Sequence, residues 1–343
     1  MTATDLQTTT DSRTTTDQLP TTVVDVAVIG GGAAGLSGAL MLARSRRSVV
    51  VIDSGTPRNA PAEGIHGLLG NEGTPPAEYL ARGRAEVRQH GGLIVAGEVA
   101  SARAAEPSAD GDLRFTLTLA DGRTLTARRL LIAAGIRDEL PQIPGLAAHW
   151  GTHLVHCPFC HGWEVRDQAI GVIATRAASF HQALMFRALS EDVIVFTTDG
   201  LDVDPATRER FAALGITLVE TGVEEIAADA EGGIAGVLLA SGELVPRTVL
   251  TTATVMRPRL DGLEDLGLQV EELPAGMGTA IATGNAGATE VPGVWVAGNA
   301  ADPSAQVGAS AAGGALAGAH MHGMLVMADA EAAVVAHRAL AEA

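Results

Sequence analysis

Residues 23–35 read Val-Val-Asp-Val-Ala-Val-Ile-Gly-Gly-Gly-Ala-Ala-Gly, and this stretch decides the fold class. The β-branched run at its start predicts a buried parallel strand, and the Ala- and Leu-rich residues as far as Arg44 predict a helix. A second apolar run from Ser48 to Ile52 predicts the next strand, with Asp53 directly after it. A strand, a G-x-G-x-x-G turn, a helix and an acid about 20 residues further on form the fingerprint of a dinucleotide-binding βαβ unit.

Each glycine of this fingerprint has a physical task. Gly30 permits the tight turn, Gly32 lets the backbone approach a pyrophosphate, and Gly35 lets the helix pack closely on the strand. The helix N-terminus stabilises the phosphate charge, and Asp53 is expected to accept hydrogen bonds from a ribose. The alternative is a glycine-rich turn in a Rossmann-like domain that has lost its ligand.

Two later strands place the parts of this domain far apart in the chain. Residues 129–135 and 294–299 each predict a strand that closes on small residues, and a long Ala/Gly helix follows the second from about Gln306. A flavin-binding fold with a second domain inserted explains this order. The helix at Gln306 would direct its positive end at the flavin pyrimidine and stabilise the anionic reduced flavin. Its composition equally fits an ordinary packing helix.

The predicted fold class is therefore α/β, with two Rossmann-like domains, the second inserted in the first. A chain of 343 residues is long enough for both. We expect an FAD-binding domain over residues 23–146 and 253–343, and an inserted domain over 147–252. The chain would cross between them at 141–150 and 255–260.

The composition excludes several classes of partner. The formal net charge is −17, and all 23 basic residues are arginines. Such a surface repels phosphate backbones and anionic lipids, which argues against nucleic acids and membranes as partners. The lack of lysine excludes Schiff-base and P-loop chemistry. Residues 1–22 are polar and lack the features of a signal peptide, so we predict a disordered tail and a cytoplasmic protein.

Both cysteines of the chain lie in the motif Cys157-Pro-Phe-Cys160-His161. Because structural disulfides are rare in the cytoplasm, this spacing predicts a redox pair. A helix N-terminus would depress the pKa of one thiol, and His161 would hold or deliver a proton near neutral pH. No metal is expected. The alternatives are a haem attachment motif, a zinc site that includes His153 or His156, and two inert buried thiols.

The middle segment lacks a second glycine fingerprint. Residues 169–173 predict a strand, but residues 174–179 contain no glycine, and Arg176 stands where a backbone would approach a pyrophosphate. No arginine cluster follows the next strand to accept a 2′-phosphate. NADPH is therefore doubtful as a cofactor, and molecular oxygen is the simplest acceptor for flavin electrons. The alternative is NADPH binding through other contacts.

On these motifs the chain resembles the low-molecular-weight thioredoxin reductase family, over nearly its whole length from Val23. The shared features are the glycine fingerprint at 30–35, the strand end at 133–135, the inserted C-x-x-C, and Ala-Gly-Asn at 297–299 followed by Gln306-Val307. The dithiol oxidase branch, which includes the gliotoxin and holomycin oxidases, is similar in Cys-Pro-Phe-Cys-His-Gly-Trp-Glu at 157–164, in Asp53 with Pro57-Arg58-Asn59, and in His66-Gly67 with Gly70. Ordinary reductases carry Asp where His161 stands.

The resemblance implies roles for the matching residues and a homodimeric assembly. Cys160 would lie against the flavin C4a, Cys157 would exchange with the substrate, and His161 would be the acid/base. The implied FAD contacts are Gly30, Gly32, Ala33, Ala34, Gly35, Asp53, Asn59, His66, Gly135, Gly298, Asn299, Gln306 and Val307. Reductases usually carry Asp at the position of Asn299, and a neutral residue there would alter a ribityl or pyrophosphate contact.

The sequence thus predicts an FAD-dependent enzyme that oxidises a dithiol in a small natural product to an intramolecular disulfide. O2 would be the acceptor and H2O2 the product. The alternatives are an NADPH-dependent reductase of thioredoxin or a similar thiol protein, and a non-catalytic flavin or metal-binding redox sensor. Phe159 and Trp163 are candidate substrate-binding residues that equally fit a core.

Overall fold

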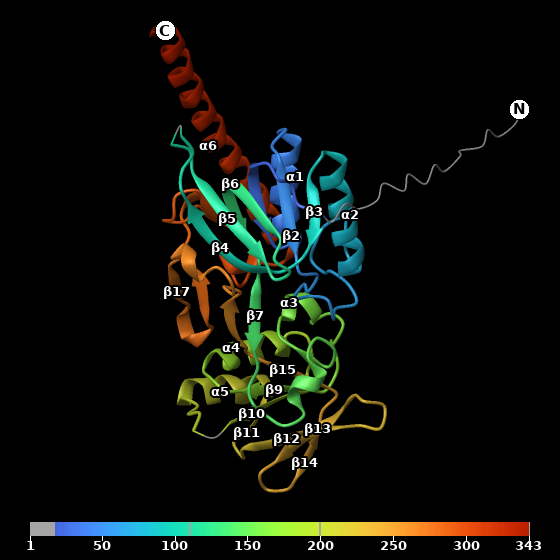
Figure 1. Cartoon of the computed structure of the whole chain (residues 1–343). Coiled ribbons are helices and arrows are strands. Elements are labelled where there is room, and N and C mark those ends of the chain that lie inside the picture. Colours follow the sequence, from blue (N-terminus) through green and yellow to red (C-terminus); the bar gives the residue numbers. More distant parts are fainter. Residues whose placement is uncertain (1–17, 110, 199, 343) are drawn as a thin grey trace, which may run out of the picture.

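The structure is a computed structural model, and it describes residues 18–109, 111–198 and 200–342 (Figure 1). Most of the predicted N-terminal tail, residues 1–17, therefore lies outside the described residues. Within the last five residues of that predicted tail, Leu19 packs against a hydrophobic core cluster.

A seven-stranded sheet forms the first unit of the fold, drawn at the top of Figure 1. The strand order is β3-β2-β1-β6-β5-β4, and β19 pairs with the end of β6. Its strands are β1 (Val24–Ile29), β2 (Val49–Asp53), β3 (Leu93–Ala96), β4 (Val99–Ala105), β5 (Arg114–Leu119), β6 (Thr124–Ile132) and β19 (Val294–Val296). All the pairs are parallel except those made by β4 and β5. The carboxyl ends of β1, β2, β6 and β19 therefore meet at one edge of the sheet.

Both faces of this sheet are covered, which explains why its strands are apolar throughout. Val26 and Val28 point toward one face, where helices α1 (Ala33–Arg44), α2 (Pro76–Gln89) and α6 (Val307–Glu342) contribute to the same core. Ala27 and Ile29 point toward the other face and pack with the β4–β5 hairpin. Because successive side chains on a strand alternate between the faces, a strand buried on both sides shows a continuous hydrophobic run.

A five-stranded parallel sheet forms the second unit, drawn at the bottom of Figure 1. Its order is β11-β10-β9-β15-β8. The elements of this unit are η1 (Leu146–His149), β8 (Leu154–Val155), α3 (Pro158–His161), β9 (Ile170–Ala174), α4 (Ala178–Arg187), β10 (Val193–Thr197), α5 (Pro205–Leu214), β11 (Thr217–Val219), β12 (Val223–Ala228), β13 (Ile234–Leu239), β14 (Leu244–Pro246) and β15 (Val249–Thr252). Helices α4 and α5 pack on one face of the sheet, and the antiparallel sheet β12-β13-β14 packs on the other.

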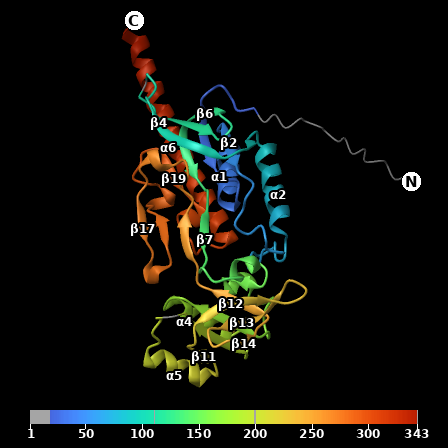
Figure 2. The same ribbon diagram turned by 60° about the horizontal axis from the view of Figure 1, so that its bottom comes forward.

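A two-stranded antiparallel ribbon connects the two units, and Figure 2 shows it between them. It consists of β7 (Ile136–Glu139) on the way out and β16 (Val255–Pro258) on the way back. The residues that follow β7, from Leu140 to Leu146, contribute side chains to the core of the second unit. The remaining elements belong to the return of the chain: η2 (Glu264–Leu266), β17 (Val270–Glu272), η3 (Pro274–Gly276), β18 (Thr279–Ile281), η4 (Asn285–Gly287) and η5 (Gly298–Ala300).

The predicted fold class, two Rossmann-like units with the second inserted in the first, is confirmed. The residue limits assigned to the two domains stay a prediction. No helix among the described residues is long and apolar enough to cross a membrane.

Candidate active site

A cavity of about 870 Å³ lies between the two units. One part of its wall comes from the strand ends and the glycine turn of the first unit, from Gly30 to Ala34 and at Gly135. The start of α6 forms another part, and Cys160 with His161 of the second unit closes the wall. A single continuous cavity therefore joins the dinucleotide fingerprint to the cysteine motif.

The glycine turn has the shape that a pyrophosphate needs. A Cβ atom on Gly35 would collide with the carbonyl oxygen of Gly30, and one on Gly30 would collide with the carbonyl oxygen of Ala133. Among the described residues, apart from the chain neighbours of Gly32, no atom lies within 4 Å of the place where a Cβ on Gly32 would stand. Gly32 thus faces open space at the N-terminus of α1, where free N–H groups favour an anion. Gly35 is not part of the cavity wall; it serves the packing of helix on strand.

Asp53 ends β2 and lines the cavity beside Gly31, as the fingerprint predicts. Its carboxylate accepts a hydrogen bond from the backbone N–H of Gly55 at 3.2 Å and forms an ion pair with Arg84 at 3.4 Å. These contacts hold the carboxylate at the cavity edge. The geometry suits an acceptor for ribose hydroxyl groups.

Asn299 organises the loop that leads into α6. Its amide nitrogen donates toward three carbonyl oxygens, at 3.2 Å for Asp302, 3.1 Å for Pro303 and 2.8 Å for Ala305. Gln306 and Val307 follow directly and line the cavity. A carboxylate at position 299 would face three carbonyl oxygens without a proton to donate, which explains why an amide stands here.

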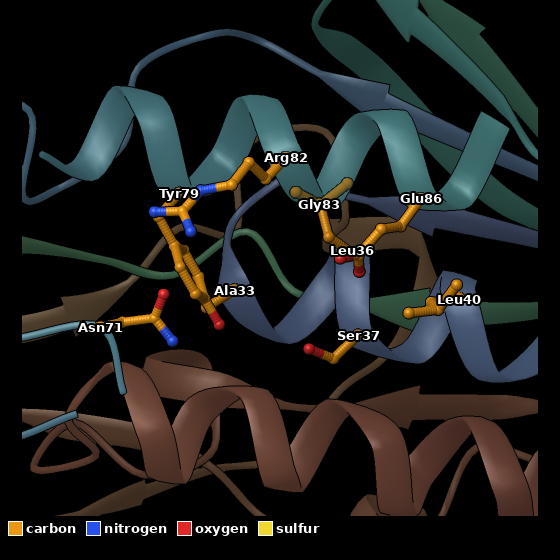
Figure 3. A pocket seen from close by; sticks show the side chains of 9 residues that line it. All are labelled: Ala33, Leu36, Ser37, Leu40, Asn71, Tyr79, Arg82, Gly83 and Glu86. Carbon is orange, nitrogen blue, oxygen red and sulfur yellow. The ribbon is translucent and has the colours of Figure 1, made fainter. Parts of the chain in front are cut away.

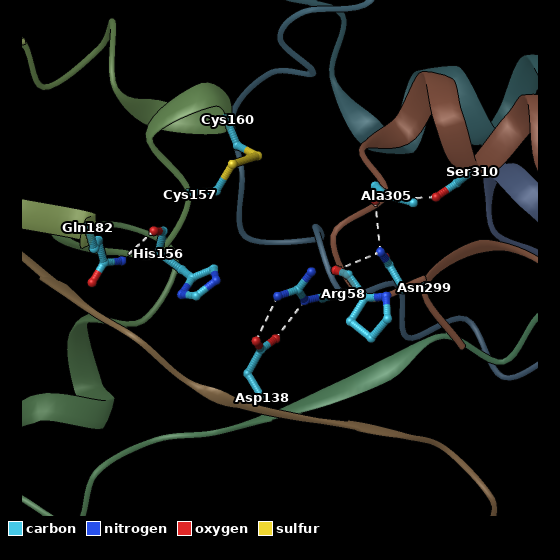
Figure 4. The surroundings of a disulfide bond; sticks show 10 residues. Arg58, Asp138, His156, Cys157, Cys160, Gln182, Asn299, Ala305 and Ser310 are labelled. Atoms are coloured by element: carbon cyan, nitrogen blue, oxygen red, sulfur yellow. Dashed lines mark hydrogen bonds and ion pairs between the residues drawn. A yellow bond between two sulfur atoms is a disulfide. The ribbon is translucent and has the colours of Figure 1, made fainter. Parts of the chain in front are cut away.

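Cys157 and Cys160 are joined by a disulfide at the end of β8 (Figure 4). Their Cα atoms are 5.2 Å apart, within the range of ordinary disulfides. Cys160 lines the cavity, whereas Cys157 does not. Figure 4 shows the disulfide and Asn299 on opposite sides of the view, with the ion pair of Arg58 and Asp138 below them. The two sulfurs are therefore not equivalent, because Cys160 faces the cavity interior.

His161 lies beside Cys160 on the cavity wall. Burial lowers the pKa of His161, and the carboxylate of Glu164 partly opposes this change. The imidazole is therefore neutral at pH 7 and able to accept a proton from a thiol. His66, from the loop between β2 and α2, lines the same cavity.

A hydrogen-bonded cluster lies beneath the disulfide and ties the first unit to the connecting ribbon. Arg58 donates two hydrogen bonds to the carboxylate of Asp138 on β7, at 2.6 and 2.7 Å, and Thr254 donates a third at 2.8 Å. The Asp138 side chain is only 4% exposed. His156, directly before Cys157, hydrogen-bonds the carbonyl oxygen of Thr252 through Nδ1 at 3.0 Å. Figure 4 shows the His156 ring beside this ion pair, below the disulfide.

Phe159 and Trp163 lie on the solvent side of the cysteine motif. They are 66% and 67% exposed, so neither belongs to a core. The guanidinium of Arg166 stacks over the Trp163 ring at 4.2 Å. Two exposed aromatic side chains beside a disulfide form a surface on which a flat apolar ligand can lie.

A smaller cavity of about 250 Å³ adjoins the large one between α1 and α2 (Figure 3). Tyr79 and Ala33 line both cavities, and Figure 3 shows the Tyr79 side chain directed from α2 toward Ala33 and Asn71. Burial raises the pKa of the Tyr79 hydroxyl, and Glu86 adds to this change.

The turn between β9 and α4 differs from a phosphate-binding loop. Arg176 occupies it, and its guanidinium donates a hydrogen bond across to the carbonyl oxygen of Gly276 in the first unit. Burial lowers the pKa of Arg176. An arginine side chain thus stands where the fingerprint would place glycine, and it is engaged in a contact between the two units.

Most of the predicted site residues meet at the large cavity. The wall includes Gly30, Gly32, Ala33, Ala34, Asp53, Asn59, His66, Gly135, Cys160, His161, Gly298, Asn299, Gln306 and Val307. Cys157, Phe159, Trp163 and Gly35 lie outside this wall.

Sequence reasoning missed many polar residues of the wall, among them Thr56, Arg58, Arg84, Arg259 and Ser310. The side chain of Arg259 donates to the Thr56 carbonyl at 3.2 Å and hydroxyl at 3.0 Å, and its buried Nε has no protein partner among the described residues. The neighbouring Pro57-Arg58-Asn59 motif was the one available signal for Arg58. Nothing in the local sequence singles out Arg84 or Arg259.

The chain is similar in sequence and in structure to known disulfide oxidoreductases. The sequence profile of the pyridine nucleotide-disulphide oxidoreductase family matches residues 24–323. The thioredoxin reductase sirT of Leptosphaeria maculans is 32% identical over 329 residues, covering 90% of this chain and 96% of that protein. The thioredoxin reductase tcpT of Claviceps purpurea is 33% identical over 265 residues, covering 75% of this chain and 80% of that protein. The crystal structure of HlmI matches with a TM-score of 0.87 and 40% identity, covering 94% of this chain and 99% of that one.

Proposed function

The chain belongs to the pyridine nucleotide-disulphide oxidoreductase family, and the relatives compared above are thioredoxin reductase-like enzymes that act on sulfur groups. From this starting point, we propose that it is an FAD-dependent dithiol oxidase. The substrate is a small-molecule dithiol, and the product is its intramolecular disulfide. The observation that carries this proposal is the single cavity that joins the dinucleotide fingerprint to Cys160 of the disulfide.

The residues of the cavity fit FAD. Gly32 leaves open space at the N-terminus of α1 for the pyrophosphate, and the carboxylate of Asp53 can accept hydrogen bonds from the hydroxyl groups of a ribose. The unpartnered Nε of Arg259 is a buried donor that a polar group of the cofactor would satisfy. The start of α6 directs its N–H groups into the same cavity through Gln306 and Val307. A flavin bound here supplies a two-electron acceptor beside Cys160.

The cysteine pair takes the electrons from the substrate. One thiol of the dithiol attacks Cys157, the sulfur outside the cavity wall, and Cys160 leaves as a thiolate. The second substrate thiol then closes the product disulfide and releases Cys157. Two S–H bonds of the substrate and the enzyme S–S bond break, one S–S bond forms in the product, and the two protons pass to basic groups of the site. His161 accepts a proton in this exchange, because burial keeps its imidazole neutral. A bound flavin would take up the electron pair when the enzyme disulfide re-forms, and O2 would accept it from there to give H2O2.

Arg176 supports oxygen rather than NADPH as the partner of the flavin. Arg176 stands in the turn after β9, and its side chain donates a hydrogen bond to the carbonyl oxygen of Gly276. A second candidate, NADPH-dependent reduction of a thioredoxin-like protein, is favoured by the names of the relatives sirT and tcpT. The two functions differ in the direction of electron flow.

Anaerobic stopped-flow mixing separates these two functions. We expect dithiothreitol to bleach the flavin absorbance rapidly and NADPH to leave it unchanged. Rapid bleaching by NADPH would contradict the oxidase function. The Cys157→Ser variant is expected to lose turnover and keep its yellow cofactor, whereas full turnover in that variant would refute Cys157 as the exchanging sulfur.

Assembly as a homodimer and a cytoplasmic location belong to this proposal. The outer face of α6 carries exposed apolar side chains at Leu316, Met324 and Met327, which a second copy would cover. Light scattering should give the mass of a dimer for the native protein and of a monomer for Met327→Glu. A native monomer would contradict the dimer.

A further inference from the structure

Two histidines and two glutamates lie in a row across the boundary between the units, beside the disulfide. His66 comes from the first unit, and its Nδ1 lies 2.7 Å from Oε1 of Glu72. Its Nε2 lies 3.6 Å from Oε1 of Glu164 in the second unit. His161 lines the same cavity as His66, and the charges of both Glu164 and His66 act on it. The row therefore runs Glu72, His66, Glu164, His161.

Glu72 fixes which nitrogen of His66 exchanges a proton. The second carboxylate oxygen of Glu72 accepts a hydrogen bond from the backbone N–H of Gly67 at 2.9 Å, and His66 with Gly67 lowers the pKa of Glu72. The carboxylate is therefore ionised, and it holds the Nδ1–H tautomer of His66. Nε2 is the ring nitrogen that faces Glu164.

A dithiol releases two protons when it becomes a disulfide, whereas one imidazole holds a single proton. We propose that His66 is a positioning residue that works with His161 through Glu164, so that the pair holds both protons of a dithiol. One proton goes from the first substrate thiol to His161, and the second is shared along Glu164 to Nε2 of His66. The electron pair goes to the enzyme disulfide, as in the proposed function on which this inference rests.

Charged and titratable groups approach His66 from two of the described segments. The loop that carries it contributes Glu72, and the segment after the disulfide contributes His161 and Glu164. The loop before α6 approaches through uncharged Gln306, whose Oε1 lies 3.4 Å from the place where a Cβ on Gly67 would stand. Changes at His66 and Glu164 should therefore act on His161 with opposite sign, since His66 lowers its pKa and Glu164 raises it.

The test is the pH profile of anaerobic flavin reduction by dithiothreitol in stopped flow. We expect His66→Gln to reduce the rate about tenfold near pH 6.5 and to move the acid limb of the profile to higher pH. Glu164→Gln should move the acid limb to lower pH. Above about pH 9 the substrate thiol ionises unaided, so the variants should approach the wild-type rate.

The control is His181→Gln, a change at an exposed histidine on α4, which should leave the profile unchanged. Wild-type rates near pH 6.5 in both His66→Gln and Glu164→Gln would overturn the inference. An equal loss of rate at every pH would also overturn it, because that result indicates a purely structural role. Flavin content is measured for each variant so that only protein with bound cofactor is compared. If dithiothreitol fails to reduce even the wild-type flavin, the proposed function itself is wrong.

Discussion

The amide nitrogen of Asn299 donates a hydrogen bond to the carbonyl oxygen of Ala305 at 2.8 Å, across the loop from which α6 starts. The same nitrogen lies within hydrogen-bond distance of two further carbonyl oxygens in this loop. The reductases that the chain resembles usually carry Asp here. The neutral side chain is therefore required by the loop itself, because a carboxylate offers no proton to a carbonyl oxygen.

Asn299→Asp should accordingly loosen the start of α6. We expect a loss of about 1 kcal/mol in the free energy of unfolding, because the bonds to Pro303 and Ala305 are partly buried and the bond to Asp302 is exposed. Flavin retention should fall as well, because Gln306 and Val307 lose their support. Urea unfolding and the flavin-to-protein ratio after gel filtration measure the two effects. A variant with native stability would show that the three carbonyls need no donor from Asn299.

The glycine turn permits a pair of matched substitutions. Gly32→Val introduces a side chain into open space, so the protein should fold and yet bind no flavin. Gly35→Val places a Cβ against the carbonyl oxygen of Gly30, so folding itself should fail. Circular dichroism and absorbance at the flavin wavelength distinguish the outcomes. If the Gly32→Val protein were yellow, it would still bind flavin, and the pyrophosphate could not bind at this turn.

The ion pair between Arg58 and Asp138 should contribute to stability. Asp138→Asn removes the charge of a side chain that is only 4% exposed and leaves Arg58, itself 30% exposed, without its charged partner, which costs about 1–3 kcal/mol. Asp261→Asn is the control, since the Arg137–Asp261 pair is more than half exposed and such pairs contribute about 0–1 kcal/mol. Equal losses for the two variants in urea unfolding would contradict the buried role of Asp138.

The same pair predicts a pH dependence. Burial alone would raise the pKa of Asp138, but the hydrogen bonds and charge of Arg58 outweigh it, so the pKa lies below its ordinary value. A carboxyl group with a lowered native pKa stabilises the fold above its unfolded pKa of about 3.9, and this stability is lost as the pH falls through the native pKa. The difference between wild type and Asp138→Asn should be full at pH 7 and should shrink below about pH 4. Thermal unfolding across that range measures it.

Trp163 should affect substrate binding without affecting stability. The ring is 67% exposed, so Trp163→Ala should change the free energy of unfolding by less than about 0.5 kcal/mol. We expect KM for an aromatic dithiol to rise several-fold while kcat stays near the wild-type value. Leu214→Ala, at the exposed end of α5, is the remote control. An unchanged KM would show that Trp163 does not contact the substrate.

Local patterns predicted the fold class, and most of the residues that they singled out line the cavity. The turn at 30–35 and the cysteine motif are each recognisable from a few neighbouring residues, so the sequence alone was enough to find them. Contacts between distant segments were not predictable. Glu72 and Glu164 carry no motif, and only the folded chain brings His66 between them. Arg58 and Asp138 are 80 residues apart, and their pairing depends on the path of β7.

The exposure of side chains near the disulfide was also beyond the sequence. Phe159 and Trp163 fitted a core as well as a surface, because periodicity says nothing over a helix of four residues such as α3. The role of Asn299 required the loop geometry, since its three acceptors are main-chain oxygens that any sequence provides.

Because β7 and β16 pair side by side, a single deletion in the gene could remove the second unit from the chain. Glu139 and Val255 are register partners in this ribbon, so the chain leaves the first unit and re-enters it at adjacent points. A short two-residue turn joining them would complete a hairpin and delete the whole insertion. Such a shortened chain would be a minimal flavin carrier without sulfur chemistry, and the same junction would accept an unrelated module in place of the one removed.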